Sequence, residues 1–164
     1  MPDRYRTRLM CAACHEVSPA TGFFSLYNNG QRGRYLFLYG LQIATEVTDG
    51  HSLDGYAFKG KQTGGTDMTT FPLKFDEAVA EGIATYGSGG GTGTAFQIQT
   101  LGSNLQGLVN WTNPWPLGII PAGWSWGFTT TETSHVYSVS FQWYCGEPLD
   151  FRPNLTEDVL DFLS

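Results

Sequence analysis

The chain has 164 residues, of which 15% are charged and 15% aromatic, and its formal net charge is −6. This length predicts one domain that can bury a core without disulfides or metals, and the acidic balance argues against a nucleic-acid partner. Three cysteines, no visible export signal and no apolar run long enough for a membrane span predict folding in a reducing cytoplasm, with free thiols and no membrane partner.

The N-terminal residues 1–20 contain two prolines and no clean periodicity, which predicts an extended arm. A β-domain is expected over residues 21–147, and it begins with a hairpin. The strands 23–27 and 34–39 of this hairpin flank Asn28-Asn29-Gly30, a sequence that tolerates the positive φ of tight turns. The second strand is expected to continue to residue 45, with Gly40 as a candidate bulge.

Later segments predict more strands and one internal helix. The helix is expected over residues 76–85, where acidic residues occupy the first turn. Residues 136–145 alternate Val, Ser, Ser and Gln with Tyr, Val, Phe and Trp, a pattern typical of a half-buried strand. The other strands are expected at 55–59, 68–75, 94–101, 107–111 and 123–131. The predicted fold class is all-β, an antiparallel β-sandwich or jelly roll.

The C-terminal residues 148–164 form a tail with a short helix that Asn154 or Thr156 could cap. This helix either folds back on its own domain or docks on a neighbouring subunit. Its apolar face, a candidate interface, consists of Leu155, Val159, Leu160, Phe162 and Leu163.

The segment Cys11-Ala-Ala-Cys14-His15 matches the C-x-x-C-H pattern of covalent haem attachment, and the same three residues could supply zinc ligands. The absence of an export signal and the β-rich remainder argue against haem, and structural zinc would need a distant fourth ligand. The favoured interpretation is a set of small residues in the arm, with no metal and no cofactor. No nucleophile–base pair is recognisable, so we expect no enzyme and no catalytic residues.

Residues 82–131 contain no Asp, Glu, Lys or Arg, yet they hold four of the five tryptophans. Trp124 and Trp126 share one strand face by their spacing, whereas Trp111 and Trp115 lie among Asn, Thr and Pro. Three roles remain open for these rings: core packing, a protein interface or a sugar-stacking platform.

Residues 114–131 read Pro114-Trp-Pro-Leu-Gly-Ile-Ile-Pro-Ala-Gly-Trp-Ser-Trp-Gly-Phe-Thr-Thr-Thr131, and a hydrophobic strand over 137–144 follows. This order of Pro-rich loop, P-x-G-W strand, polar turn and final strand resembles small β-sandwich proteins of tailed-phage virions. The resemblance covers residues 34–145 in general pattern and 114–145 in wording. It implies a capsid- or tail-bound structural protein, often a trimer or a surface decoration.

The resulting hypothesis is a non-enzymatic virion structural protein, a decoration or cement protein of a tailed-phage capsid that is made in the host cytoplasm. Its expected partners are the major capsid protein or neighbouring subunits, and a homo-oligomer such as a trimer is expected. The predicted contacts are the apolar face of the tail together with Trp111 and Trp115. The alternative is a carbohydrate- or receptor-binding module of a tail or adsorption apparatus.

Overall fold

A computed structural model describes the backbone of residues 9–17, 22–45, 51–73, 81–87, 95–105, 108–112, 116–130 and 137–146. Side chains are described for 22–44, 55–73, 81–87, 116–129 and 137–146. Every regular element in these ranges is a β-strand, and no helix in them is long and apolar enough to cross a membrane. The strands are β1 Leu9–Val17, β2 Phe23–Tyr27, β3 Tyr35–Thr45, β4 His51–Lys59, β5 Gly65–Asp67, β6 Thr70–Pro72, β7 Ile83–Gly87, β8 Ala95–Leu105, β9 Leu108–Thr112, β10 Gly118–Pro121, β11 Trp124–Thr130 and β12 Tyr137–Gly146.

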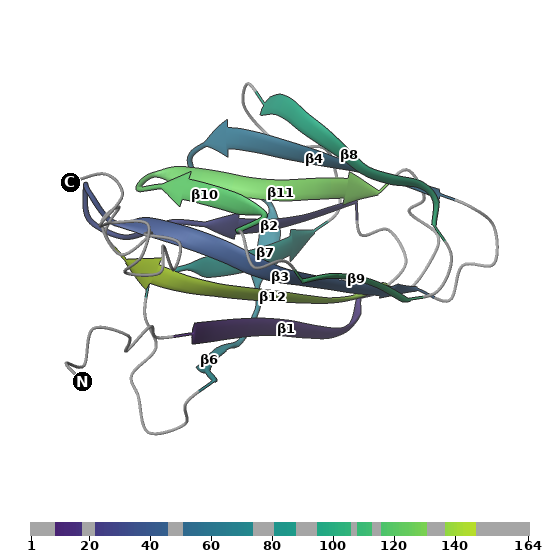
Figure 1. Cartoon of the computed structure of the whole chain (residues 1–164), viewed down its shortest axis with the longest axis horizontal. Helices are drawn as coiled ribbons and strands as arrows, with labels where there is room; N and C mark the ends of the chain where they lie inside the picture. The colour runs from purple at the N-terminus through teal and green to yellow at the C-terminus, as the bar shows by residue number, and fades with distance from the viewer. Residues whose placement is uncertain are drawn as a thin grey trace, which may run out of the picture.

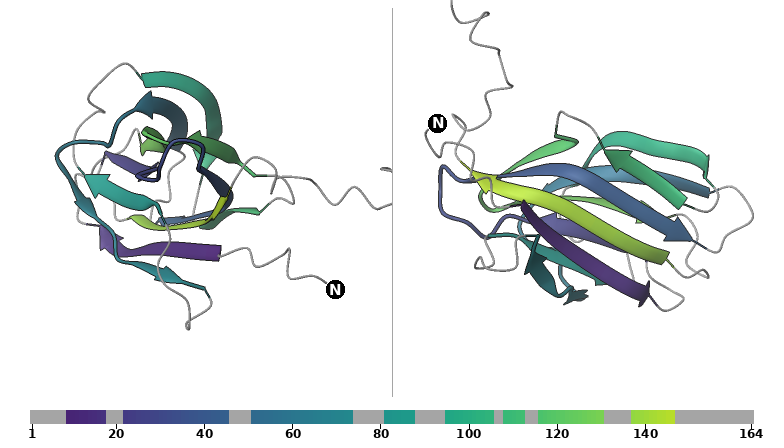
Figure 2. Two further views of the ribbon diagram at one scale, coloured as in Figure 1. Left: turned by 90° about the vertical axis from the view of Figure 1, so that its left-hand side faces the viewer. Right: turned by 60° about the horizontal axis from the view of Figure 1, so that its bottom comes forward.

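The strands form two six-stranded antiparallel sheets (Figure 1). Sheet A has the order β10-β3-β12-β1-β6, and β9 also pairs with β3, beyond the end of β10. Sheet B has the order β5-β7-β2-β11-β4-β8. Viewed along the strands, both sheets surround a common interior (Figure 2). The all-β antiparallel prediction is confirmed.

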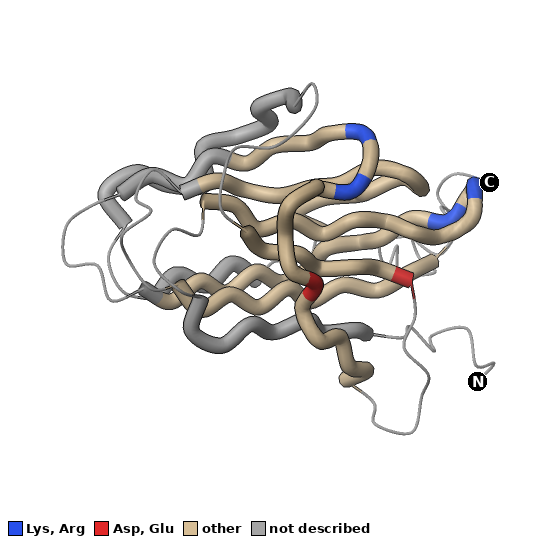
Figure 3. The backbone as a smooth tube through the Cα atoms, turned by 180° about the vertical axis from the view of Figure 1, so that it is seen from behind, with Lys and Arg blue, Asp and Glu red and all other residues tan. Residues whose placement is uncertain are grey.

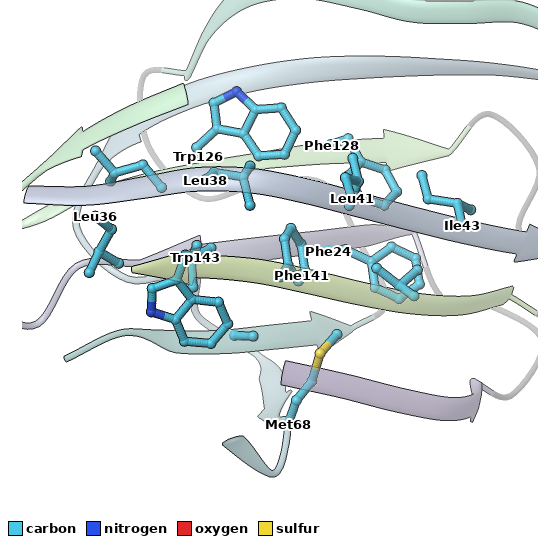
Figure 4. Close-up of a cluster of buried hydrophobic side chains, with 14 of the residues drawn as sticks. Phe24, Leu36, Leu38, Leu41, Ile43, Met68, Trp126, Phe128, Phe141 and Trp143 are labelled. Carbon is cyan, nitrogen blue, oxygen red and sulfur yellow. The ribbon is translucent and has the colours of Figure 1, made fainter. Parts of the chain in front are cut away.

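One hydrophobic cluster joins the two sheets. Phe24, Trp126 and Phe128 from sheet B and Leu38 and Phe141 from sheet A all belong to it (Figure 4). Phe24 stacks on Phe128 with ring centroids 5.1 Å apart. On β12 the core-facing residues Tyr137, Val139, Phe141 and Trp143 are buried, and Ser138, Ser140 and Gln142 between them are only half-buried, as the alternation predicted, whereas Tyr144 after them is buried as well. Removal of this apolar surface from water is the main stabilising term of the fold.

The two strands predicted around Asn28-Asn29-Gly30 are present as β2 and β3, but the predicted hairpin is wrong, because β2 pairs with β7 and β11 in sheet B whereas β3 pairs with β12, β10 and β9 in sheet A. The turn that connects the two sheets is built around Asn28. This side chain is fully buried. Its amide nitrogen donates to the carbonyl oxygens of Arg34 (3.0 Å) and Ile120 (2.8 Å), and its Oδ1 accepts from the backbone N–H of Gly30 (2.9 Å). Asn28 therefore holds the turn together and anchors β10, to which Ile120 belongs.

The bulge predicted at Gly40 is also present. The β3–β12 register shifts between Gln142, which pairs with Gly40, and Trp143, which pairs with Leu38. A Cβ on Gly40 would lie 2.7 Å from Oε1 of Gln142, so the glutamine side chain covers this glycine. Glycine permits that close approach because it lacks a side chain.

Three segments differ from the sequence predictions. Residues 9–17, expected in an arm, form β1 between β12 and β6, because two neighbouring strands supply its hydrogen bonds. The expected helix 76–85 overlaps β7, which pairs with β2 and β5. Of the expected strand 68–75, only residues 70–72 form a strand within the described part, which is β6 of sheet A, and the preceding β5 lies before the expected strand and belongs to sheet B. The proposed C-terminal helix lies outside the described residues.

Residues 60–73, which we call the strap, connect the two sheets. The strap leaves β4 and crosses the outer side of sheet B to reach β5 at the far edge of that sheet (Figure 3). Only Met68 and Thr69 then separate β5 from β6 of sheet A. Met68 is buried in the core cluster, and its N–H donates to the carbonyl of Ala84 (2.8 Å). The strap therefore closes one side of the core.

Candidate interface on the outer face of sheet A

Strand alternation shows which side chains of β3 and β10 point away from the core. Leu38 and Ile120 belong to the core cluster, so their neighbours Phe37 and Ile119 lie on the opposite, outer face. Phe37 and Ile119 are direct partners in the β3–β10 ladder and therefore lie side by side. Ile119 is 47% exposed, the largest value among the exposed large hydrophobic residues of the described part.

The opposite edge of sheet A carries two more exposed apolar side chains. Gln142 lies on the outer face, where it covers Gly40. The backbone of Cys11 pairs with both Gln142 and Phe71, so Phe71 projects from the same outer face. Phe71 is 38% exposed, and Leu73, which directly follows β6, is 43% exposed. The three exposed large hydrophobics of the described residues thus all lie on sheet A or next to its edge.

An aromatic group forms the floor between these two edges. Phe37 stacks on Tyr144 with ring centroids 4.8 Å apart, and Tyr39 stacks on Tyr144 at 5.7 Å. Phe37 and Tyr144 are 1% and 4% exposed. Burial raises the pKa of Tyr39. Phe37 and Tyr144 are therefore shielded from solvent already in the single chain, and the large apolar side chains that remain exposed lie at the two edges.

Charged side chains are concentrated elsewhere. Among the side chains that the structure describes, none in a strand of sheet A is charged, whereas the charges lie in the turns, in the strap and in sheet B (Figure 3). The described charged residues are Arg32, Arg34, Lys59, Lys61, Asp67 and Glu81. The described side chains of sheet A could therefore be buried without the cost of desolvating a charge.

The strap lies on the outer face of sheet B, so this face is not available as an interface. Ser125 Oγ, on the outer side of β11, donates to the carbonyl of Gly60 in the strap (2.6 Å). Phe23 points away from the core, yet it is buried, and a Cβ on Gly65 of the strap would lie 2.9 Å from its ring. Within the strap, Lys61 and Asp67 form an ion pair at 2.7 Å, and Asp67 also accepts a hydrogen bond from Thr85 of β7 at 3.2 Å. Sheet B is therefore already covered by its own chain.

A polar cluster at one end of the core contains residue types that are common in catalytic sites. Glu81 accepts a hydrogen bond from the thiol of Cys145 and pairs with the Arg34 guanidinium at 3.3 Å. The hydrogen bond from Cys145, followed by the nearby charge of Arg34, lowers the pKa of Glu81. Burial and the hydrogen bond to Glu81 raise the pKa of Cys145 to about 11.

These pKa shifts are opposite to those that nucleophilic catalysis requires. A reactive cysteine needs a depressed pKa, whereas Cys145 remains a thiol at neutral pH. The backbone carbonyl of Glu81 accepts from Trp143 Nε1 (2.9 Å), and the N–H of Gly82 donates to Oδ1 of Asn29 (2.7 Å). The cluster thus fastens the start of β7 to β12 and to the β2–β3 turn, which is a structural role.

Some residues singled out in the sequence lie in the described part. Of the tryptophans whose role the sequence left open, Trp126 is buried in the core and Trp124 is partly buried against it; Trp143 on β12 is buried as well. Trp111 contributes backbone to β9, as Cys11, Cys14 and His15 do to β1, but the side chains of these four residues lie outside the described set. Trp115 and the tail residues Leu155, Val159, Leu160, Phe162 and Leu163 also lie outside it.

The candidate interface residues Phe71, Leu73 and Ile119 escaped the sequence reasoning. Ile119 lies in a Pro-rich segment without alternation, and Phe71 lies in a segment whose strand pairing is non-local. The only signal in the sequence was the placement of apolar residues next to proline in short segments. Among the described side chains, no group of three or more His, Cys, Asp or Glu is arranged to hold a metal ion.

Comparisons of the chain with protein-family models, with curated proteins and with solved structures found no match. The functional argument therefore depends on the strand pairing and on the surface of sheet A.

Proposed function

We propose that the fold is a jelly roll. In a jelly roll, eight antiparallel strands pair as a long hairpin that has been rolled up, so that the first strand pairs with the last, the second with the seventh, and so on inward. If the inserted β5, β6 and β7 are set aside and β9 and β10 count as one strand, the pairs β1–β12, β2–β11, β3–β9/β10 and β4–β8 follow this order.

On this fold we propose a non-enzymatic structural protein of a tailed-phage virion, which decorates or cements the capsid. The observation that carries the proposal is the outer face of sheet A, which exposes Ile119 and Phe71 at its two edges, with exposed Leu73 directly after β6, and has no charged side chain among those described. Jelly rolls are frequent in viral capsid proteins. Exposed apolar side chains that gather on one face typically mark a protein–protein contact.

The tail supplies a second proposed contact. Its sequence holds the apolar set Leu155, Val159, Leu160, Phe162 and Leu163, which would bind a neighbouring subunit or the major capsid protein. An apolar segment that orders on binding adds contact area at the cost of its own conformational entropy. Deletion of residues 155–164 should therefore reduce incorporation into particles while the thermal stability of the β-domain stays the same.

The direct test is quantitative mass spectrometry of density-purified particles of the phage that encodes the chain. The proposal expects peptides of the chain at many copies per particle, in fixed ratio to the major capsid protein. Particles without the chain, alongside abundant chain in the infected-cell lysate, would refute a virion role. In the same preparations, the Ile119→Asp variant should be depleted from particles, and the Thr66→Asp variant, with the same charge on exposed β5, should be retained.

A carbohydrate-binding module of a tail or adsorption apparatus is the second candidate, since jelly rolls also occur among lectins. A sugar platform requires exposed aromatic rings, and Trp126 and Trp143 are buried. A panel of host surface glycans distinguishes the two candidates, because a sugar that stacks on an exposed Trp would change its fluorescence. A saturable change with one glycan class would favour the module.

A further inference from the structure

Positive charge gathers at one end of the two sheets, where three turns meet. These turns are residues 28–34 after β2, residues 59–61 at the end of β4 and residues 121–124 between β10 and β11. Backbone hydrogen bonds join them directly, because the N–H of Gly60 donates to the carbonyl of Gly123 (2.8 Å) and the N–H of Gly123 donates to the turn after β2 (2.9 Å). We call these three turns the basic platform. The Lys and Arg side chains that the structure describes all lie on it (Figure 3): Arg32, Arg34, Lys59 and Lys61.

Part of this positive charge is not balanced by a described acidic side chain. The two acidic side chains in the described part of the chain pair with Arg34 at 3.3 Å and with Lys61 at 2.7 Å. Arg32 and Lys59 are both exposed, and neither has an acidic partner among the residues that the structure describes. The platform therefore presents positive charge to solvent in a chain whose net charge is −6.

The tail, residues 147–164, carries the opposite charge and starts close to the platform. Five acidic residues and one arginine give it a net charge of −4. It follows Gly146, which pairs with Tyr35, the residue next to Arg34 of the platform. Glu157 follows Gly146 by 11 residues, and a random coil of that length spans roughly 18 Å. The acidic residues of the tail can therefore reach the platform of their own chain.

The helix predicted in the tail separates its acidic residues from its apolar residues. Positions three and four apart share one face of a helix, so Glu157, Asp158 and Asp161 lie on one face. The apolar set named above, from Leu155 to Leu163, occupies the opposite face. An acidic face can thus bind the platform while the apolar face remains available to a neighbouring subunit.

From this charge complementarity we propose that the acidic face of the tail docks on the basic platform of its own chain, with Arg32 and Lys59 as the main contacts. The chain's own tail is favoured over that of a second copy, because its attachment at Gly146 gives its acidic residues a high effective concentration at the platform. Exposed ion pairs contribute little to stability, so the melting temperature of the β-domain hardly depends on the docked tail. This inference concerns the free chain and goes beyond the virion role, which it does not require.

The test joins lysine amines to carboxylates in contact with them, by means of a water-soluble carbodiimide. The sample is an equal mixture of unlabelled and isotope-labelled full chain, so peptide mass spectrometry shows whether both halves of a link come from one chain. The Lys61–Asp67 pair is an internal positive control, since its amine and carboxylate lie 2.7 Å apart. The proposal expects a link between Lys59 and the acidic face of the tail within one chain. Its yield should fall at least about threefold in about 1 M salt, where the screening length is about 3 Å.

The variant Arg32→Glu tests the platform without removing the amine that reacts. It reverses one platform charge, so the yield of the link between Lys59 and the tail should fall at least about threefold. The control Thr66→Asp, which adds a negative charge on exposed β5, should leave this link unchanged. Circular dichroism verifies that each variant is folded.

The proposal is overturned if Lys59 forms no link to the tail while the Lys61–Asp67 link forms. A link found only between differently labelled chains would overturn it as well and would assign the tail to a neighbouring copy. A link that neither salt nor Arg32→Glu weakens would show that charge does not hold the tail at the platform, which also contradicts the proposal. Detection of the chain in purified particles is independent of these results, so failure of the docked tail and failure of the virion role remain distinguishable.

Discussion

Replacement of Asn28 by alanine should be among the most destabilising single changes in the turn between β2 and β3. The side chain is fully buried and makes three hydrogen bonds, two as donor to the carbonyls of Arg34 and Ile120 and one as acceptor from Gly30. At about 1 kcal/mol for each bond the loss is about 3 kcal/mol, and the buried carbonyls left without a donor add to it. For a chain of this size that corresponds to a fall in melting temperature of roughly 6 to 12 °C.

The assay is urea unfolding followed by Trp fluorescence, with Asn29→Ala as the matched control. Asn29 is exposed and accepts one hydrogen bond, from the N–H of Gly82 (2.7 Å), so its replacement should cost only about 1 kcal/mol. Asn28→Asp keeps the acceptor but turns a second oxygen toward two carbonyls, and it should destabilise at least as much as alanine. Equal losses for Asn28→Ala and Asn29→Ala would refute the reasoning.

Three further predictions concern the end of the core around Glu81. Gly82→Ala should lower the free energy of unfolding by at least about 3 kcal/mol, because φ is +123° and the new Cβ would lie 2.5 Å from Trp143 Nε1. The control Gly33→Ala, with φ +92° and no atom within 4 Å of the new Cβ, should lower it by only about 1 kcal/mol. Urea unfolding of both variants measures the difference. At pH 8, alkylation of Cys145 should be about 100-fold slower in the folded chain than in urea, because folding raises the pKa of its thiol from 9.0 to about 11. Peptide mass spectrometry measures the rate, and equal rates in the two states would contradict the shift. The pKa of Glu81 is lowered on folding, so its contribution to stability is present above its unfolded pKa of about 4.5 and is lost as the pH falls through the lower folded value. In Glu81→Gln, the free energy of unfolding should therefore fall less steeply as the pH is lowered through this range. An unchanged pH dependence would show that Glu81 does not contribute to it.

The strands that could be predicted from the sequence are those with a clear pattern along one segment. β2, β3, β11 and β12 alternate or flank an Asn-Gly turn, and the structure has them within about two residues of the expected bounds. β1 and the strap could not be predicted in this way. β1 reads Leu-Met-Cys-Ala-Ala-Cys without alternation, and the strap is rich in Gly and Thr, so both depend on pairing with strands distant in sequence.

The surface was predicted less well than the fold, for a related reason. The uncharged segment 82–131 is divided between the two sheets, because β7, β8 and β11 belong to sheet B and β9 and β10 to sheet A. The uncharged face instead combines Ile119 with residues of β3, β6 and β12, which are distant in the sequence. Only the strand register brings Ile119, Phe37 and Tyr144 into one row.

The central claim is that the chain assembles through the outer face of sheet A, and carbene footprinting of the free and the particle-bound chain tests it most directly. Labelling at Phe71, Leu73 and Ile119 should fall several-fold in the bound state, while labelling of the strap residues Lys61 and Thr63 should not change. Unchanged labelling at the three apolar residues, with protection of the strap instead, would contradict the account and would place the contact on sheet B.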